Sequence, residues 1–146
     1  MNFFKKSLLL LESVVLCCLV SCDKYGTSNN STDYSKVIVG HWFNTGTADN
    51  NLVELSLGVK NPNSASYYDL IDQDWGVMAF GTFELNGNKL TIVFDDVQVT
   101  DENRKKTSRN GFTDSVSRTV SYTILDCDGK TLYMVDDEQN RSAWEN

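Results

Sequence analysis

The segment from Trp75 to Phe94 constrains the fold more than any other part of the chain, because it predicts two paired strands and the turn between them. Asn86-Gly87 is typical of a type I′ turn, in which both central residues adopt positive φ. With this turn, Phe83 faces Leu90 on one side of the hairpin, and every second residue shares that side. The segment therefore predicts a long β-hairpin with one apolar face.

The same register places Glu84 opposite Lys89 on the other side of the hairpin, which is a favourable cross-strand pair. A second hairpin is predicted around Asp128-Gly129, between residues 120–125 and 131–135, with a loop of either two residues or three with a bulge. A further half-buried strand is indicated by apolar residues that alternate with polar or small ones, namely Val53, Leu55, Leu57 and Val59.

Apolar runs and turn residues together predict strands near residues 37–44, 52–60, 65–71, 75–85, 89–99, 116–125, 131–136 and 140–145. About eight short antiparallel strands in succession indicate an all-β fold, either a small up-and-down barrel or a sandwich. The polar run at 98–115 is then a long hairpin tip or a loop.

The amino terminus predicts export. Lys5 and Lys6 precede an apolar stretch from Ser7 to Val20, as in a secretory signal peptide. Its fourteen residues would form a helix of about 21 Å, which is shorter than the roughly 30 Å hydrocarbon core of a membrane. Leu19-Val20-Ser21-Cys22 follows and resembles the lipobox of bacterial lipoproteins, which implies cleavage after residue 21 and lipidation of Cys22.

Two or more acyl chains, such as palmitate, on Cys22 would attach the protein stably to a membrane. We expect the cell envelope, and specifically the outer membrane, on either its periplasmic or its outer side. Residues 22–35 are rich in Ser, Thr and Asn and predict a flexible tether ahead of one domain at 36–146.

Without residues 1–21, the chain has eleven basic and nineteen acidic residues, a net charge of −8. This acidic balance argues against nucleic acid as a partner, and we expect a monomer.

Cys127 would be the only thiol left in the mature chain, so no internal disulfide is expected. Its acidic neighbours Asp126 and Asp128 should raise the pKa of this thiol, and we interpret it as a turn residue without a chemical role.

The order of these elements resembles the lipocalin-like lipoproteins of Bacteroidetes-type bacteria. The resemblance rests on the lipobox, the tether, Val37 to Trp42, Gly81 to Ile92 and the Asp-Gly-Lys turn near 128, and it spans most of residues 36–136. It implies a lipocalin-like barrel. Gly40-x-Trp42 resembles the lipocalin Gly-x-Trp, whose indole closes the barrel floor under an arginine from near the chain end, and Arg141 is the candidate here. Asp114-Ser115-Val116 resembles an O-glycosylation acceptor of these bacteria, which implies sugar on Ser115.

Eight-stranded barrels are either filled by side chains or hold one small ligand, so two functions are expected as alternatives. In the first, the domain binds a small apolar or amphipathic ligand in a cavity lined by Trp75, Phe83, Ile92 and Tyr122. In the second, a filled domain contacts a protein or glycan through its 98–115 loop.

The sequence offers no positive sign of catalysis, of a cofactor or of a metal site. His41 is the only histidine, and on a strand it should point to solvent where Trp42 points inward. The acidic clusters lack the spacing of a calcium loop. No Gly-x-Ser-x-Gly motif is present, so we do not expect an enzyme.

Overall fold

The computed structural model describes residues 33–46, 51–71, 74–100 and 110–146, with only the backbone for residues 51, 71, 74 and 75. The predicted signal peptide, Cys22 and residues 101–109 of the predicted loop lie outside the described residues. Within the described residues, no helix is both long enough and apolar enough to cross a membrane.

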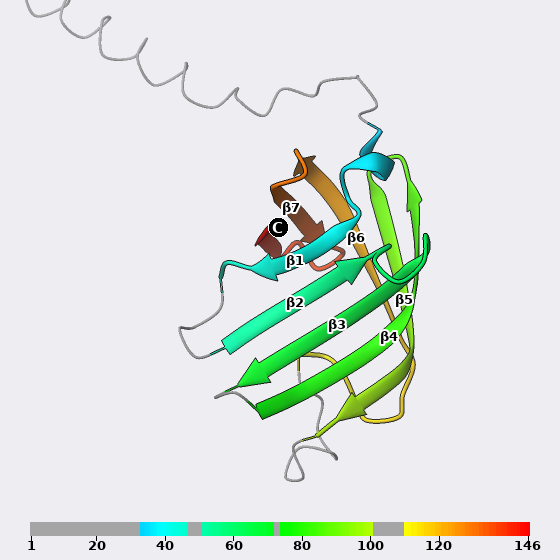
Figure 1. The fold of residues 1–146 in the computed structure, drawn as a ribbon, viewed down its shortest axis with the longest axis vertical. Coiled ribbons are helices and arrows are strands. Elements are labelled where there is room, and N and C mark those ends of the chain that lie inside the picture. The colour runs from blue at the N-terminus through cyan, green and yellow to red at the C-terminus, as the bar shows by residue number, and fades with distance from the viewer. Residues whose placement is uncertain (1–32, 47–50, 72–73, 101–109) are drawn as a thin grey trace, which may run out of the picture. The chain divides into compact units, whose positions relative to one another are not determined.

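Eight strands in the described part of the chain form a closed antiparallel barrel, in which each strand pairs with its neighbours in sequence (Figure 1). This confirms the predicted all-β, lipocalin-like up-and-down barrel. A short 3₁₀ helix, η1, precedes the strands. The elements are η1 (Tyr34–Lys36), β1 (Gly40–Asn44), β2 (Asn51–Leu57), β3 (Ser64–Ile71), β4 (Asp74–Asn86), β5 (Lys89–Val99), β6 (Arg118–Cys127), β7 (Thr131–Asp136) and β8 (Arg141–Glu145).

The barrel closes where β1 pairs with β8, through Phe43 opposite Glu145 and Asn44 opposite Trp144. Closure leaves neither of these strands as an open edge. We call the end at which β1, β3, β5 and β7 finish the mouth, and the opposite end, which carries the β2–β3, β4–β5 and β6–β7 turns, the floor.

Period-two alternation sorts the side chains of the strands into an inner and an outer set. In β2, Val53, Leu55 and Leu57 are buried as predicted, whereas Leu52 is 42% exposed. Val59 departs from the prediction because Gly58, at φ +69°, turns the chain before it, and Val59 is 47% exposed. The floor half of the barrel is filled by side chains with at most 2% exposure, among them Trp42, Leu57, Leu90, Ile124, Leu132 and Met134.

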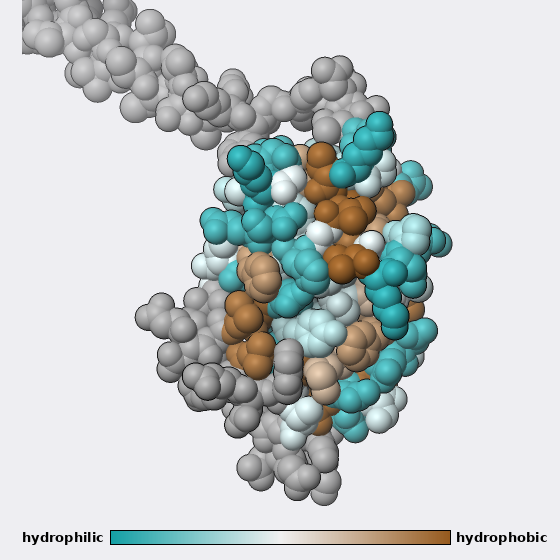
Figure 2. All heavy atoms as spheres, viewed as in Figure 1, coloured by the Kyte–Doolittle hydropathy of each residue, from teal (hydrophilic) through white to brown (hydrophobic). Residues whose placement is uncertain are grey.

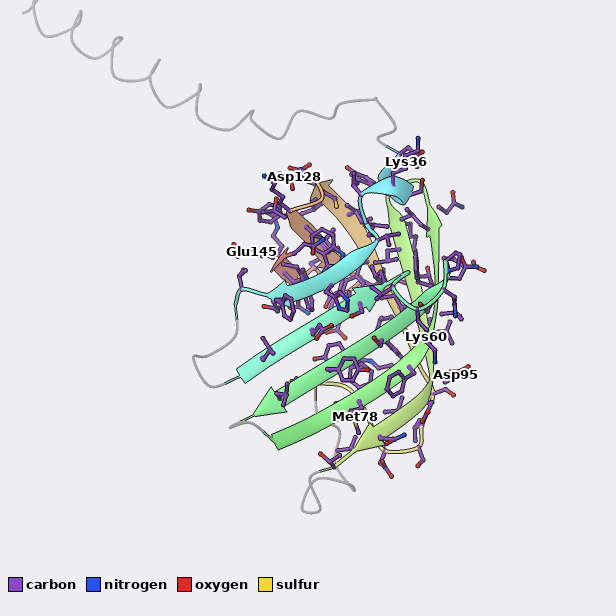
Figure 3. The ribbon with its side chains drawn as sticks, in the orientation of Figure 1. Lys36, Lys60, Met78, Asp95, Asp128 and Glu145 are labelled. Carbon is purple, nitrogen blue, oxygen red and sulfur yellow. The ribbon has the colours of Figure 1, made fainter. Side chains whose placement is uncertain are left out.

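The segment before β1 covers the floor. Tyr34 is buried in the core, the Trp42 Nε1 donates a hydrogen bond to the Ile38 carbonyl at 2.7 Å, and the Cys127 Sγ donates to the Val37 carbonyl at 3.7 Å. Lys36 and Asp128 accordingly lie at the same end of the barrel (Figure 3). The predicted boundary at residue 36 is therefore too late, because the core already includes Tyr34.

All buried apolar side chains of the described residues lie between Tyr34 and Trp144. The folded unit assigned from its internal contacts likewise runs from Thr32 to Asn146. The chain from residue 32 onward therefore contains a complete core.

The β4–β5 hairpin exists as predicted, but its turn lies one residue later. Asn86 pairs with Lys89, so the two loop residues are Gly87 and Asn88 rather than Asn86 and Gly87. Of the two, only Gly87 has positive φ, at +61°, which is the pattern of a type II′ turn.

The later turn corrects the predicted pairs. Phe83 lies opposite Ile92 instead of Leu90, and Glu84 lies opposite Thr91 instead of Lys89. The displacement is two residues, an even number, so the inward and outward faces are unchanged.

A bulge interrupts the same hairpin nearer the mouth. Phe80 pairs with Asp96 and Gly81 with Phe94, which leaves Asp95 without a direct partner on β4. A Cβ on Gly81 would lie 1.8 Å from the carbonyl oxygen of Val93. The close approach of the two backbones at this point therefore requires glycine.

The β6–β7 hairpin confirms the second predicted turn. Cys127 pairs with Leu132, and the carboxylate of Asp128 accepts hydrogen bonds from the backbone N–H groups of Lys130 and Thr131, at 2.8 and 2.7 Å. A register shift between Ile124 and Asp126 leaves one extra residue in β6, so the bulge lies within the strand.

Candidate functional site

A cavity of about 330 Å³ occupies the mouth half of the barrel. Its wall is formed by inward side chains of four strands and by one residue of the β5–β6 connection, namely Val53, Leu55, Tyr67, Ile92, Phe94, Phe112 and Trp144. Its rim carries polar side chains, among them Asn44, Asn110, Arg118, Tyr122, Asp136, Asn140, Arg141 and Ser142. The barrel is thus filled at its floor and hollow at its mouth.

Three aromatic rings form one side of the wall. The rings of Tyr67 and Phe112 stack with centroids 4.7 Å apart, and Phe94 meets Phe112 edge-on at 5.4 Å. Tyr67 and Phe94 are placed by the alternation of β3 and β5. These geometries are favourable ones for aromatic pairs, so the wall is a rigid apolar surface.

Phe112 reaches the barrel interior because the chain turns sharply before it. Asn110 and Gly111 both have positive φ, at +48° and +77°, and Phe112 is only 3% exposed. The Arg118 guanidinium lies 4.4 Å from the centroid of the Phe112 ring and donates a hydrogen bond to the Asn110 carbonyl. The described part of the 98–115 segment therefore turns its aromatic side chain inward.

Asp69 anchors this turn from inside the barrel. Its carboxylate is 2% exposed and accepts a 2.6 Å hydrogen bond from the Asn110 side-chain amide, which also lies 3.4 Å from the Tyr67 hydroxyl. Burial, and then the charge of Asp69, raises the pKa of the Tyr67 phenol well above its usual range. Tyr67 is consequently a neutral hydroxyl at physiological pH.

The rim carries two guanidinium groups and one carboxylate. Asp136 accepts hydrogen bonds from the backbone N–H groups of Glu138 and Asn140, and from the Asn140 side-chain amide at 3.0 Å. These bonds, led by those from Asn140, lower the pKa of Asp136. The Arg141 side chain is exposed and forms neither an ion pair nor a hydrogen bond within the described residues.

Tyr122 projects into the cavity from β6. Burial raises the pKa of its hydroxyl, whereas the nearby Arg118 charge acts in the opposite direction. Within the residues described, this hydroxyl has no hydrogen-bond partner. It is therefore available to a molecule in the cavity.

Two of the four predicted ligand residues, Ile92 and Tyr122, line this cavity. Phe83 does not line it, although it lies opposite Ile92 and is buried in the core. Trp75 belongs to β4, but its side chain lies outside the described residues.

Sequence reasoning missed Phe94, Phe112, Arg118 and Trp144. The alternation of β5 and β8 could have indicated Phe94 and Trp144. Phe112 and Arg118 follow a polar run and have no periodic signal of their own.

The predicted pair of Trp42 and Arg141 does not form. Trp42 is fully buried, and its neighbour Phe43 pairs with Glu145 at the end of β8. Arg141 begins β8 opposite Val135, at the mouth. The cation–π contact among the described residues is instead that of Arg118 with Phe112. Gly40 lies against the chain end, where an added Cβ would meet the Asn146 side chain at 2.6 Å.

A second hollow, an open groove of about 870 Å³, lies on the outer face of β1–β4 beside His41, Glu54, Ser56 and Tyr68. Hydrophobic side chains occur in small separate groups among hydrophilic ones on the face shown in Figure 2. His41 is exposed, as predicted from the buried Trp42 next to it.

The groove holds a serine, a histidine and a glutamate in contact, but not in the order that activates a serine. The Ser56 hydroxyl donates to the Glu54 carboxylate at 2.7 Å, and both the same carboxylate oxygen and the Ser56 hydroxyl lie near His41 Nδ1, at 2.7 and 3.0 Å. A catalytic serine would instead donate to the ring nitrogen that the carboxylate does not contact. No group of three His, Cys, Asp or Glu side chains among the described residues is arranged to hold a metal ion.

Cys127 is buried and is the last residue of β6, so it precedes the turn in which we expected it. Its pKa is raised, as predicted, but burial is the main cause and the charges of Asp128 and Asp126 contribute less.

Ser115 is exposed in a turn at φ +59°, and its hydroxyl donates to the Asp114 carboxylate at 3.2 Å. Its glycosylation stays a prediction.

Comparisons of the chain with protein-family models, with curated proteins and with solved structures find no match.

Proposed function

We propose that the barrel binds a small amphipathic ligand in the cavity at its mouth. The observation that carries this proposal is the combination of about 330 Å³ of space with an aromatic and aliphatic wall. Pockets for small ligands are typically of this size, mostly apolar, and provided with a few polar groups that fix orientation.

The energetics favour an occupant with an apolar body. Removing apolar surface from water contributes roughly 25 cal/mol per Å², and the wall already has its geometry without a ligand. The base of the cavity at Leu55, Ile92 and Phe94 would take the apolar part, and the rim at Tyr122 and Arg141 would take the polar part.

The alternative, a filled domain that presents the 98–115 loop to a partner, has less support. Phe112, an apolar residue of this segment that could anchor a protein partner, is buried against Tyr67 and Phe94. Catalysis has less support still, since the Ser56 hydroxyl and the Glu54 carboxylate both contact the same ring nitrogen of His41, Nδ1, and also each other. A binding protein is therefore the proposal, and not an enzyme.

The proposed location in the cell rests on the sequence. A lipobox-like Leu19 to Cys22 after a basic, apolar amino terminus supports a lipid anchor at Cys22 and a place in the cell envelope. In that position the domain would receive or hold its ligand next to a membrane.

Native mass spectrometry of residues 23–146 tests the proposal, with decanol, decanoate and a glycan panel added in turn. We expect a one-to-one complex with an amphipathic compound. Refusal of every compound by the folded domain would contradict the proposal and redirect attention to the 98–115 loop.

A pair of variants on β5 tests whether the cavity is the binding site. Ile92→Trp adds bulk where the side chain faces the cavity, and Val93→Trp adds the same bulk outside, where the residue is 40% exposed. Ile92→Trp should abolish the complex and Val93→Trp should preserve it. If Ile92→Trp unfolds, Val53→Phe at the cavity wall replaces it.

A further inference from the structure

We infer that the ligand carries an anionic head group, which binds at the rim between Arg118, Arg141 and the Tyr122 hydroxyl. This inference rests on the proposed function, because it concerns the same cavity. It adds the chemical class of the ligand, which is a molecule with one apolar body and a carboxylate or phosphate at one end.

Some of the polar groups at the rim already have hydrogen-bond partners within the protein. The Asp136 carboxylate accepts three hydrogen bonds within its own turn, from the backbone of Glu138 and Asn140 and from the Asn140 amide. Its lone pairs are therefore largely committed. The Arg141 guanidinium and the Tyr122 hydroxyl have no hydrogen-bond partner among the described residues. The groups left open at the rim are predominantly donors.

The Arg118 side chain is held in one orientation by its neighbours. Its guanidinium lies over the Phe112 ring, donates to the Asn110 carbonyl and packs against Gly111. A guanidinium has five N–H donors, and the contact with Asn110 involves a single nitrogen, Nη1. The remaining donors stay available in a fixed direction, which is the preorganised state that favours binding of a carboxylate or phosphate.

Anionic, neutral and cationic head groups should bind at this rim with different affinities. An anion gains charge-assisted hydrogen bonds from two guanidiniums, and such bonds are stronger than those between neutral groups. A cationic head would be repelled by both guanidiniums and would find Asp136 already engaged. A neutral alcohol would gain the cavity contacts without the ionic ones. The order of affinity should therefore be anion, then alcohol, then cation.

Isothermal titration of residues 23–146 with decanoate, decyl phosphate, decanol and decyltrimethylammonium tests this order. The two anions separate a carboxylate from a phosphate, and the tighter of them identifies the head group. Either anion should bind at least about tenfold more tightly than decanol, with an affinity that falls as salt is raised.

Arg141→Gln is the decisive variant, because the Arg141 side chain forms no ion pair or hydrogen bond with a described residue and its loss should not affect folding. It should weaken decanoate binding about tenfold and leave decanol binding unchanged. Lys89→Gln is the matched control, since it removes the same charge from an exposed position at the floor and should change neither affinity.

The outcomes separate this inference from the proposed function. Equal binding of decanoate and decanol, or an Arg141→Gln variant that binds decanoate normally, would overturn the anionic head group and leave the cavity function standing. Failure of all four compounds to bind would overturn both.

Discussion

At the scale of single residues, the barrel depends on a few side chains whose roles come from contacts made across the fold. Gly81 permits the closest backbone approach between β4 and β5. Asp128 organises the β6–β7 turn by accepting the N–H groups of Lys130 and Thr131. Neither role depends on hydrophobicity, so both can be tested by small substitutions that leave the core unchanged.

Gly81→Ala should destabilise the domain by about 2–3 kcal/mol, because the new methyl group would overlap the Val93 carbonyl and force the two strands apart. Gly87→Ala is the comparison. Its methyl would meet nothing within 4 Å, so only the positive φ of +61° opposes it, at about 1 kcal/mol. Urea unfolding followed by tryptophan fluorescence measures both. Equal losses would mean that the bulge at Gly81 can relax.

Acid should weaken the β6–β7 turn through Asp128. Its pKa is lowered by the hydrogen bonds from Thr131 and Lys130, so the folded state binds the proton more weakly than the unfolded state. The corresponding stability is complete above the ordinary carboxyl pKa of about 4 and is lost as the pH falls through the lower folded value.

The matched variants are Asp128→Asn and Asp126→Asn. Thermal unfolding between pH 7 and pH 3 should show a shallower acid loss for Asp128→Asn than for the unmodified chain. Asp126→Asn should leave the slope unchanged, because Asp126 is exposed and accepts no hydrogen bond from the described residues. The same slope in both variants would remove Asp128 from this role.

At the scale of elements, strand positions follow from local pattern, whereas register does not. The eight strands lie within a few residues of their predicted ranges because apolar runs bounded by turn residues mark where each of them begins and ends. The β4–β5 register was predicted two residues out, since Asn86-Gly87 and Gly87-Asn88 both contain a glycine able to take positive φ. The choice between them is made by long-range contacts, including the Ile124 N–H bond to the Asn88 carbonyl at 2.7 Å.

Helix η1 could not be predicted from composition, because Tyr34 lies in a run rich in Ser, Thr and Asn that is typical of a tether. Tyr34→Ala should cost about 3 kcal/mol, since the ring is 9% exposed and belongs to the core. Tyr25→Ala, within the predicted tether, should cost nothing measurable. Urea midpoints of the two variants compare them directly. A neutral Tyr34→Ala would mean that the floor is closed by Ile38 and Trp42 alone.

At the scale of the whole molecule, the mouth cavity depends on how eight strands close around the side chains that point inward. Alternation placed Ile92 and Tyr122 on the inner face, and both line the cavity. It could not reveal that the floor half is filled and the mouth half is not, because that depends on side chains from several strands meeting across the barrel. Phe112 and Arg118 enter the site from a polar connection, and only the folded chain brings them there.

The proposed anchor determines where this cavity would operate, and Cys22→Ala tests it. Without the thiol no lipid can be attached, and the chain should accumulate as an unlipidated precursor that retains residues 1–21. Incorporation of a labelled palmitate analogue and the intact mass of the isolated protein measure both effects. Cys18→Ala is the matched control, because it removes a neighbouring cysteine inside the predicted signal and should leave labelling and cleavage normal. Normal cleavage and membrane retention of Cys22→Ala would exclude the lipid anchor, and would leave the barrel without its proposed place at a membrane.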